Sequence, residues 1–123
     1  MKSLLLIGIL FCSLSVIMGA FGAHLLKDKL SEYYMSVFNK AVLYQMFHSI
    51  AIIITVIMNQ IYNTNQFSIC GWIFVMGIVL FSGSLYILSI TGIKWLGAIT
   101  PIGGILFIVS WFIMFYVVLK LEI

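Results

Sequence analysis

Gln45 and His48 carry the most versatile chemistry in an otherwise apolar part of the chain. They lie in "LYQMFHSIA", residues 43–51, inside the segment 41–93 that contains no Lys, Arg, Asp or Glu. An amide donates and accepts hydrogen bonds, and an imidazole can also act as a base, a proton carrier or a metal ligand. In hydrocarbon each group would lose hydrogen bonds worth several kcal/mol. Both side chains must therefore face protein or water.

Other polar residues are expected to meet this pair at one end of a helical bundle. Threading the expected spans up and down places them in the half of the membrane next to the 27–40 loop. There they would line a one-sided polar cup: His24, Tyr44, Gln45, His48, Ser82, Ser84, Tyr86 and Thr100. His48 would lie about 10 Å inside the boundary if its helix starts near Ala41. The same residues could instead form an interhelical hydrogen-bond cluster that fixes helix register.

The residue types limit the chemistry that such a cup could perform. Metal binding needs three or four ligands, and two histidines without a nearby carboxylate or thiolate do not supply them. Haem ligation by His24 and His48 would require comparable depths, which their positions oppose. Ser84 activated by His48 would lack a carboxylate to orient the imidazole. We therefore expect no enzyme, no cofactor and no metal site.

The charged residues divide the chain into membrane spans. Of the 123 residues, 64% are hydrophobic and 7% are charged, a composition that cannot build a water-facing surface. A helix needs about 20 apolar residues to cross a membrane, and the runs do not alternate as β-barrel strands do. We predict one all-α membrane domain over 1–123, with four transmembrane helices near 3–25, 41–58, 67–90 and 97–119. The first run is longer than the apolar region of a signal peptide, so we expect it to be retained.

Two segments between the spans have patterns of their own. Residues 28–40 carry Leu30, Tyr34 and Val37 on one helical face, which predicts an amphipathic helix lying at the interface before the second span. A linker with a helical tendency is the alternative. In the fourth span, Thr100 is expected to be the N-cap and Pro101 the first helical residue.

Small residues predict where helices approach closely. In the first span, five of them follow spacings of 4, 3, 4 and 3, which is a heptad seam: Gly8, Cys12, Ser15, Gly19 and Gly22. Later spans offer Gly83, Pro101, Gly103 and Gly104 for packing. The partner of the seam could be another span or another copy of the chain. Because a short bundle leaves this seam available, we expect a homo-oligomer.

Charge placement bears on orientation and partners. Lys27, Lys29, Lys40 and Lys94 fall on one face and Lys2 and Lys120 on the other, so the positive-inside rule places the 27–40 and 91–95 loops in the cytoplasm. The net charge of +3 is spread without a dense basic patch, which gives no case for nucleic acid. Membrane lipid is the expected partner, with an unidentified membrane protein as a further one.

Five ordered motifs give the chain a family resemblance. They are "GAFGAH" at 19–24, "AVLYQMFH" at 41–48, "LFSGSLY" at 80–86, "TG" at 91–92 and "LGAITPIGG" at 96–104. Together they resemble the small membrane proteins called domain of unknown function family 423, related to eukaryotic transmembrane protein 256. The resemblance covers nearly the whole chain. It implies four spans, chiefly in bacterial cytoplasmic membranes, and brings no established activity. Ser110 departs from the family pattern, which has glycine before Trp111.

Three functions are compatible with these observations. The first is a non-enzymatic binding or accessory protein whose cup holds a small polar group or a lipid headgroup. The second is a small transporter or channel subunit, which would need a continuous polar path across the membrane. The third is a structural partner within a larger membrane complex.

Overall fold

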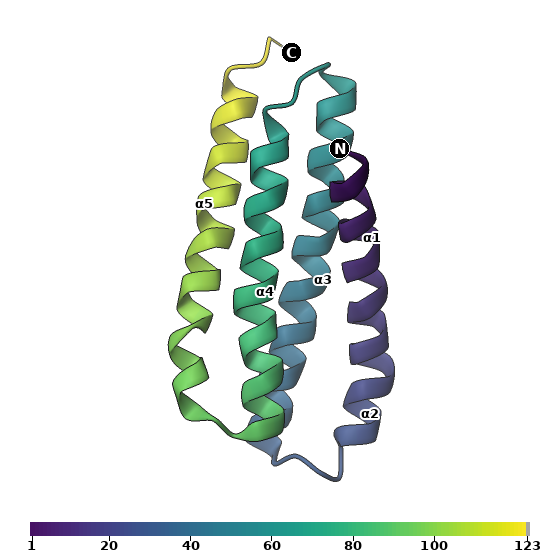
Figure 1. The fold of residues 1–123 in the computed structure, drawn as a ribbon, viewed down its shortest axis with the longest axis vertical. Helices are drawn as coiled ribbons and strands as arrows, with labels where there is room; N and C mark the ends of the chain where they lie inside the picture. Colours follow the sequence, from purple (N-terminus) through teal and green to yellow (C-terminus); the bar gives the residue numbers. More distant parts are fainter. Residues whose placement is uncertain (123) are drawn as a thin grey trace.

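The computed structural model describes residues 1–122 and consists of four long helical segments packed side by side (Figure 1). Each is long and apolar enough to cross a membrane: Lys2–Leu26, Glu32–Ile61, Phe67–Thr91 and Lys94–Leu119. Both termini lie toward the same end of the bundle (Figure 1). The predicted all-α fold with four spans is confirmed.

Two of the four segments contain an irregular turn. A π-helical turn joins the first two helices of the first span, and a 3₁₀ turn precedes the last helix. The bounds are α1 Lys2–Ile17, π turn Met18–Gly22, α2 Ala23–Leu26, α3 Glu32–Ile61, α4 Phe67–Thr91, 3₁₀ turn Lys94–Ala98 and α5 Thr100–Leu119. α4 ends at Gly92, whose φ of 71° is the left-handed conformation that favours glycine after a helix.

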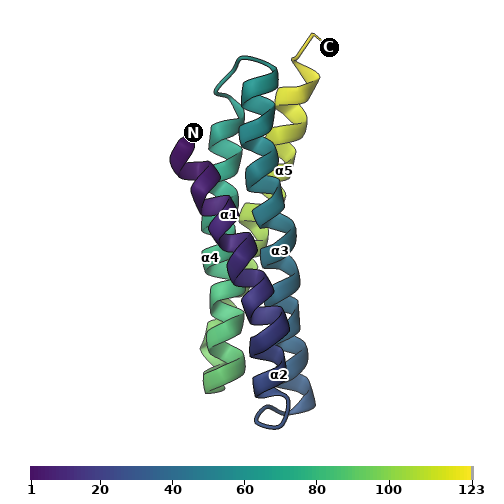
Figure 2. The same cartoon turned by 90° about the vertical axis from the view of Figure 1, so that its right-hand side faces the viewer.

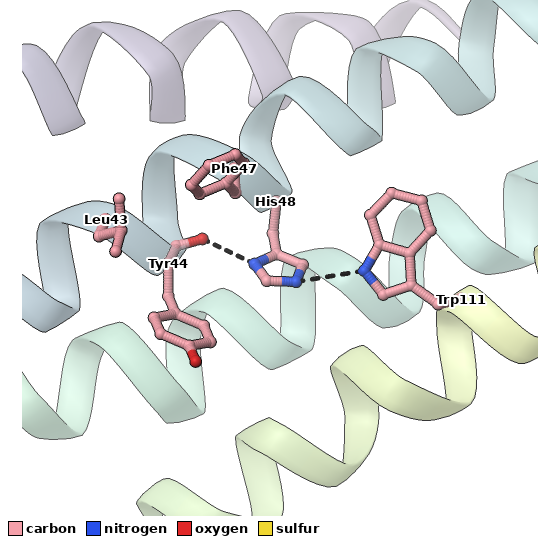
Figure 3. Close-up of a pocket in the computed structure, with 5 residues that line it drawn as sticks. All are labelled: Leu43, Tyr44, Phe47, His48 and Trp111. Carbon is pink, nitrogen blue, oxygen red and sulfur yellow. Dashed lines mark hydrogen bonds between the residues drawn. The ribbon is translucent and has the colours of Figure 1, made fainter.

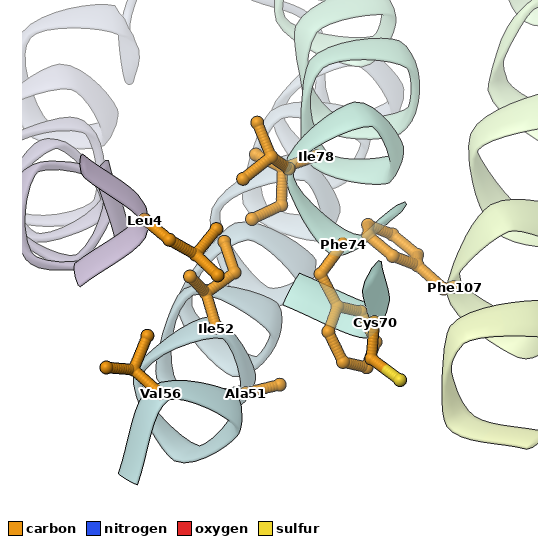
Figure 4. Close-up of a cluster of buried hydrophobic side chains, with 9 residues drawn as sticks. Leu4, Ala51, Ile52, Val56, Cys70, Phe74, Ile78 and Phe107 are labelled. Carbon is orange, nitrogen blue, oxygen red and sulfur yellow. The ribbon is translucent and has the colours of Figure 1, made fainter. Parts of the chain in front are cut away.

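The central pair of the bundle is α3 and α4. α1 packs mainly on α3, crossing it obliquely, and α5 packs on α4 (Figures 1 and 2). α3 and α4 bury a larger share of their residues than the two outer spans. All four helices contribute to one apolar core cluster, which includes Leu4, Ile52, Phe74 and Phe107 (Figure 4). The outer helices therefore expose most of their apolar surface, as a lipid-facing helix does.

Residues 32–40 differ from the expected interfacial helix because they form the first turns of α3. Ser31 caps the helix by accepting a hydrogen bond from the Tyr34 backbone N–H at 3.2 Å, and Glu32 lies in the first turn, where an acidic residue is favourable. No Gly or Pro interrupts the helix before Ala41. As a result His48 lies near the middle of α3 rather than close to its start.

The start of α5 also differs from the expectation. Ile99 is the N-cap, and Thr100 already belongs to the helix, with Pro101 in the first turn. The Thr100 hydroxyl is instead shared with Ser84 of α4, at an Oγ to Oγ1 distance of 2.7 Å. The hydroxyl thus joins two helices rather than capping one.

The small-residue seam of α1 faces α3. A Cβ added at Gly8 would lie 3.0 Å from Ile53, and one at Gly19 would lie 3.0 Å from Val42. Gly22 approaches Phe38 at the same distance, and Ser15 is buried. Cys12 is half-buried, and its carbonyl accepts a hydrogen bond from the Ser15 hydroxyl at 2.7 Å. The seam is used within the chain, so a homo-oligomer would have to form through another surface.

Candidate functional site

His48 is held from two sides between α3 and α5. Its ring stacks on Phe107 of α5, with ring centroids 3.5 Å apart and an angle of 7° between the planes. Nδ1 lies 2.7 Å from the Tyr44 carbonyl oxygen one turn earlier, and Nε2 accepts a hydrogen bond from the Trp111 indole N–H at 3.4 Å (Figure 3). The imidazole therefore has one orientation.

These contacts also define the tautomer of His48. A carbonyl oxygen can only accept a hydrogen bond, so Nδ1 must carry a proton and donate it in a hydrogen bond to the Tyr44 carbonyl oxygen. Nε2 then has a free lone pair, which agrees with the indole N–H pointing at it. The ring is a neutral imidazole whose hydrogen-bond acceptor is directed toward Trp111 and α5.

A groove of about 340 Å³ opens beside this imidazole, and Figure 3 shows the residues that line it. It is lined by Leu43, Tyr44, Phe47, His48 and Trp111. His48 itself is 7% exposed, whereas Trp111 is 44% exposed. The groove is thus mainly apolar and aromatic, and His48 and Trp111 form a polar edge beside the ring of Tyr44.

Gln45 points away from the His48 groove, toward α1 and α4, and joins three helices. Its Nε2 donates to the Phe11 carbonyl oxygen of α1 at 2.9 Å, and its Oε1 accepts from the Tyr86 hydroxyl of α4 at 2.7 Å. The side chain is 5% exposed. Both polar ends of the amide are therefore occupied by protein.

The predicted serines and threonine link neighbouring helices in pairs. Ser82 donates to the Ala41 carbonyl oxygen at 2.7 Å, which ties α4 to α3. Ser84 donates to the Phe81 carbonyl oxygen at 2.9 Å and contacts Thr100. The predicted cup residues are consequently divided among four contacts: Gln45 with α1 and α4, His48 with α5, Ser82 with the Ala41 carbonyl, and Ser84 with Thr100.

His24 and the two cysteines lie apart from these clusters. His24 is exposed on α2, next to the loop, while His48 is buried halfway along α3. Cys12 is half-buried and Cys70 is buried, and both are free thiols. Within residues 1–122, no three His, Cys, Asp or Glu side chains are grouped so that they could hold a metal ion.

A second groove, of about 400 Å³, lies where α5 begins. Apolar residues of three elements make its walls, and Lys40, Tyr33 and Thr100 supply its polar groups: the lining is Tyr33, Val37, Lys40, Phe81, Leu85, Leu88, Gly97, Thr100 and Pro101. We call it the Lys40 groove. Of the predicted cup residues, only Thr100 lines it.

The later packing glycines are not equivalent. A Cβ on Gly103 would lie 2.4 Å from the Phe81 backbone nitrogen, so α4 and α5 can approach this closely only because position 103 has no side chain. At Gly104 the nearest atom would be 3.8 Å away, which is ordinary contact, and at Gly83 no atom lies within 4 Å. Pro101 is exposed. Of the predicted packing glycines, Gly103 is the one at which α4 and α5 approach most closely.

Three residues that supply polar groups to the two grooves were not among the predicted site residues. Trp111 shares a face of α5 with Phe107, four residues earlier, and this spacing was the available signal. Lys40 and Tyr33 were assigned to an interfacial segment, so they were not placed beside Thr100. Ser110 is fully buried and donates to the Cys70 carbonyl oxygen at 2.7 Å.

Comparisons with known proteins agree with this architecture. A model of the family described as "Protein of unknown function (DUF423)" matches residues 18–104. The chain is similar to a UPF0382 membrane protein of Staphylococcus epidermidis, 45% identical over 120 residues that cover 98% of each chain. It is 50% identical over 114 residues to one of Staphylococcus haemolyticus, covering 93% of each. It is 40% identical over 121 residues to one of Bacillus subtilis, covering 98% of each.

No solved structure matches the chain. The similar proteins are bacterial and are named membrane proteins, in agreement with the four apolar helices found here. The motifs that predicted the resemblance, from "GAFGAH" to "LGAITPIGG", extend from 19 to 104 and fall within the matched residues. The chain therefore belongs to the DUF423 family, a family of membrane proteins of unknown function.

Proposed function

We propose that this protein is a non-enzymatic binding protein of the bacterial cell membrane, and that the Lys40 groove holds the headgroup of an anionic phospholipid. The observation that carries the proposal is a cationic side chain in a mostly apolar groove. A phospholipid has the complementary arrangement, with a negative phosphate beside an acyl chain.

Charge supports this assignment of the ligand. Lys40 is exposed, and the nearest preceding acid on its helix, Glu32, is eight residues and about 12 Å away along the axis. A lysine near a membrane surface contributes about 1 kcal/mol to the attraction of anionic lipid. The start of α5 also borders the groove, and the partial positive charge of a helix N-terminus adds to that of Lys40.

The walls of the groove support a lipid rather than a free anion. Val37, Phe81, Leu85 and Leu88 are apolar, so they can pack against an acyl chain below the headgroup. Tyr33 lies at the same edge as Lys40, where an amphipathic ring suits the interface. With the 27–40 and 91–95 loops in the cytoplasm, the headgroup would belong to the inner leaflet.

The test compares two lysine variants in nanodiscs. Phosphatidylglycerol binding is measured by native mass spectrometry, with phosphatidylcholine of identical acyl chains as the reference lipid. We expect Lys40→Gln to weaken phosphatidylglycerol binding roughly fivefold, which corresponds to about 1 kcal/mol. Phosphatidylcholine binding should change little.

Lys94→Gln is the matched control, since Lys94 begins the 3₁₀ turn on the same side of the bundle but does not line the groove. It removes the same charge and should leave binding near the wild-type value. Equal losses in the two variants would mean that the lysines attract lipid only through overall charge, and the proposed site would be abandoned.

A further inference from the structure

The groove beside His48 has a chemistry that the Lys40 groove lacks. Its polar edge holds one acceptor, His48 Nε2, and one donor, the Trp111 indole N–H. The two nitrogens are 3.4 Å apart, at the long end for a hydrogen bond. Among residues 1–122, the only side-chain hydrogen bond between α3 and α5 is thus a long one, and the stacking of His48 on Phe107 is the other contact here.

The acceptor is fixed while the donor is accessible. Stacking on Phe107 and the Tyr44 carbonyl hold the imidazole so that Nε2 keeps its lone pair. Trp111 is 44% exposed on the outer surface of α5. A ligand reaching the groove therefore meets a preorganised acceptor beside an indole N–H that has room to change partner.

Position determines how a ligand would reach this groove. His48 lies halfway along α3, sixteen residues after Glu32 and thirteen before Ile61. The lining residues Leu43, Phe47 and Trp111 are exposed on the lipid-facing surface of the bundle. A ligand would thus enter sideways from the hydrocarbon, and it must itself be membrane-soluble.

We propose that the His48 groove binds the hydroxyl group of a membrane-soluble alcohol or phenol. A hydroxyl donates its proton to His48 Nε2 and accepts the Trp111 N–H on its oxygen, replacing one long hydrogen bond by two of ordinary length. A ketone or ester carbonyl has no proton for Nε2. A carboxylate would bring an unpaired charge to the middle of the membrane, which is costly.

The size and lining of the groove suit such a molecule. Its volume of about 340 Å³ is within the range of small-molecule sites, roughly 300 to 1,000 Å³. The rings of Tyr44, Phe47 and Trp111 offer faces and edges against which an aromatic ring or a hydrocarbon chain can pack.

The test uses 4-octylphenol and its methyl ether, 4-octylanisole, which differ by the hydroxyl proton. The chain contains three tryptophans, so the substitutions Trp72→Phe and Trp95→Phe leave Trp111 as the only tryptophan that fluoresces. In nanodiscs, Trp111 fluorescence should report binding of the phenol about fivefold tighter than the anisole, as expected for one net hydrogen bond. In the same background, His48→Phe should remove that preference.

A second measurement does not depend on a His48 variant. In ¹⁵N-histidine-labelled protein carrying His24→Gln, the one remaining imidazole is His48. Its Nε2 resonance should move upfield when 4-octylphenol is added and stay in place with 4-octylanisole. Equal affinity for the two compounds, or an unchanged Nε2 resonance at saturating phenol, would overturn the proposal. Since Lys40 plays no part in this groove, Lys40→Gln should leave the phenol preference intact.

Discussion

Gln45 and His48 are three residues apart on one helix, yet their surroundings differ in kind. Gln45 is linked to α1 and α4 by hydrogen bonds of 2.9 and 2.7 Å, while His48 meets α5 through a contact of 3.4 Å at the edge of a groove. A groove of about 250 Å³ also borders Gln45, but the amide oxygen and nitrogen there already have protein partners. Gln45 thus links three helices, whereas His48 borders an open groove on the same helix.

Moving α5 away from α4 should cause the largest loss of stability, and it should affect the surroundings of His48 but not those of Gln45. Gly103→Ala places a Cβ 2.4 Å from the Phe81 backbone nitrogen, so the helices must separate. We expect the free energy of unfolding in mixed micelles to fall by about 3 kcal/mol. Because the Gln45 hydrogen bonds involve α1, α3 and α4, they should persist while the His48 contact with Trp111 is lost.

The control for this substitution is Gly104→Ala, the same chemical change one residue later. Its Cβ would lie 3.8 Å from the nearest atom. We expect an unfolding free energy close to that of the wild type. Similar losses from both variants would show that the close approach at Gly103 is not the cause.

Removing the Gln45 amide should cause the next largest loss of unfolding free energy. Gln45→Leu deletes the bonds to Phe11 and Tyr86 and leaves the Tyr86 hydroxyl without its partner. We expect a loss of about 1 to 3 kcal/mol in unfolding free energy. A double-mutant cycle with Tyr86→Phe should give a coupling of about 0.6 to 1.7 kcal/mol. Additive effects of the two changes would contradict the direct hydrogen bond.

Replacing the imidazole should cost the least stability. His48→Phe keeps an aromatic ring to stack on Phe107 and loses the bonds to Tyr44 and Trp111, of which the second is long. We expect the unfolding free energy to change by about 0.6 kcal/mol or less. A loss as large as that of Gln45→Leu would place His48 among the structural residues, and the contrast between Gln45 and His48 would disappear.

The spans could be predicted from the sequence because charge and hydropathy act over whole segments. The uncharged runs 3–26, 41–93 and 95–119 are long enough for membrane helices, whatever their packing. The start of α3 could not be placed as reliably. Residues 32–40 are amphipathic, and an interfacial helix and the first turns of a longer helix share that pattern.

The separation of Gln45 from His48 into different surroundings depends on the angle between their side chains around the axis of α3. The sequence pattern does not show which neighbouring helix each side chain meets. Residues three apart on an α-helix are separated by about 60° around its axis. That difference was too small to separate Gln45 from His48 in a sequence pattern. It is nevertheless large enough to direct one toward α1 and α4 and the other toward α5. The predicted single cup assumed that both would face the same space.

The uneven burial of the spans bears on the order in which the protein assembles. α3 is the least apolar of the four, and it buries Gln45, His48, Ser49, Thr55 and Asn59. Alone in lipid it would leave the Gln45 and Asn59 amides without partners, whereas the first span, which contains α1, is the most apolar and exposes most of its surface. α1 can therefore be stable in the bilayer as an independent helix while the rest of the chain is synthesised. The buried polar groups of α3 gain their remaining partners only after α4 has been synthesised and inserted beside it.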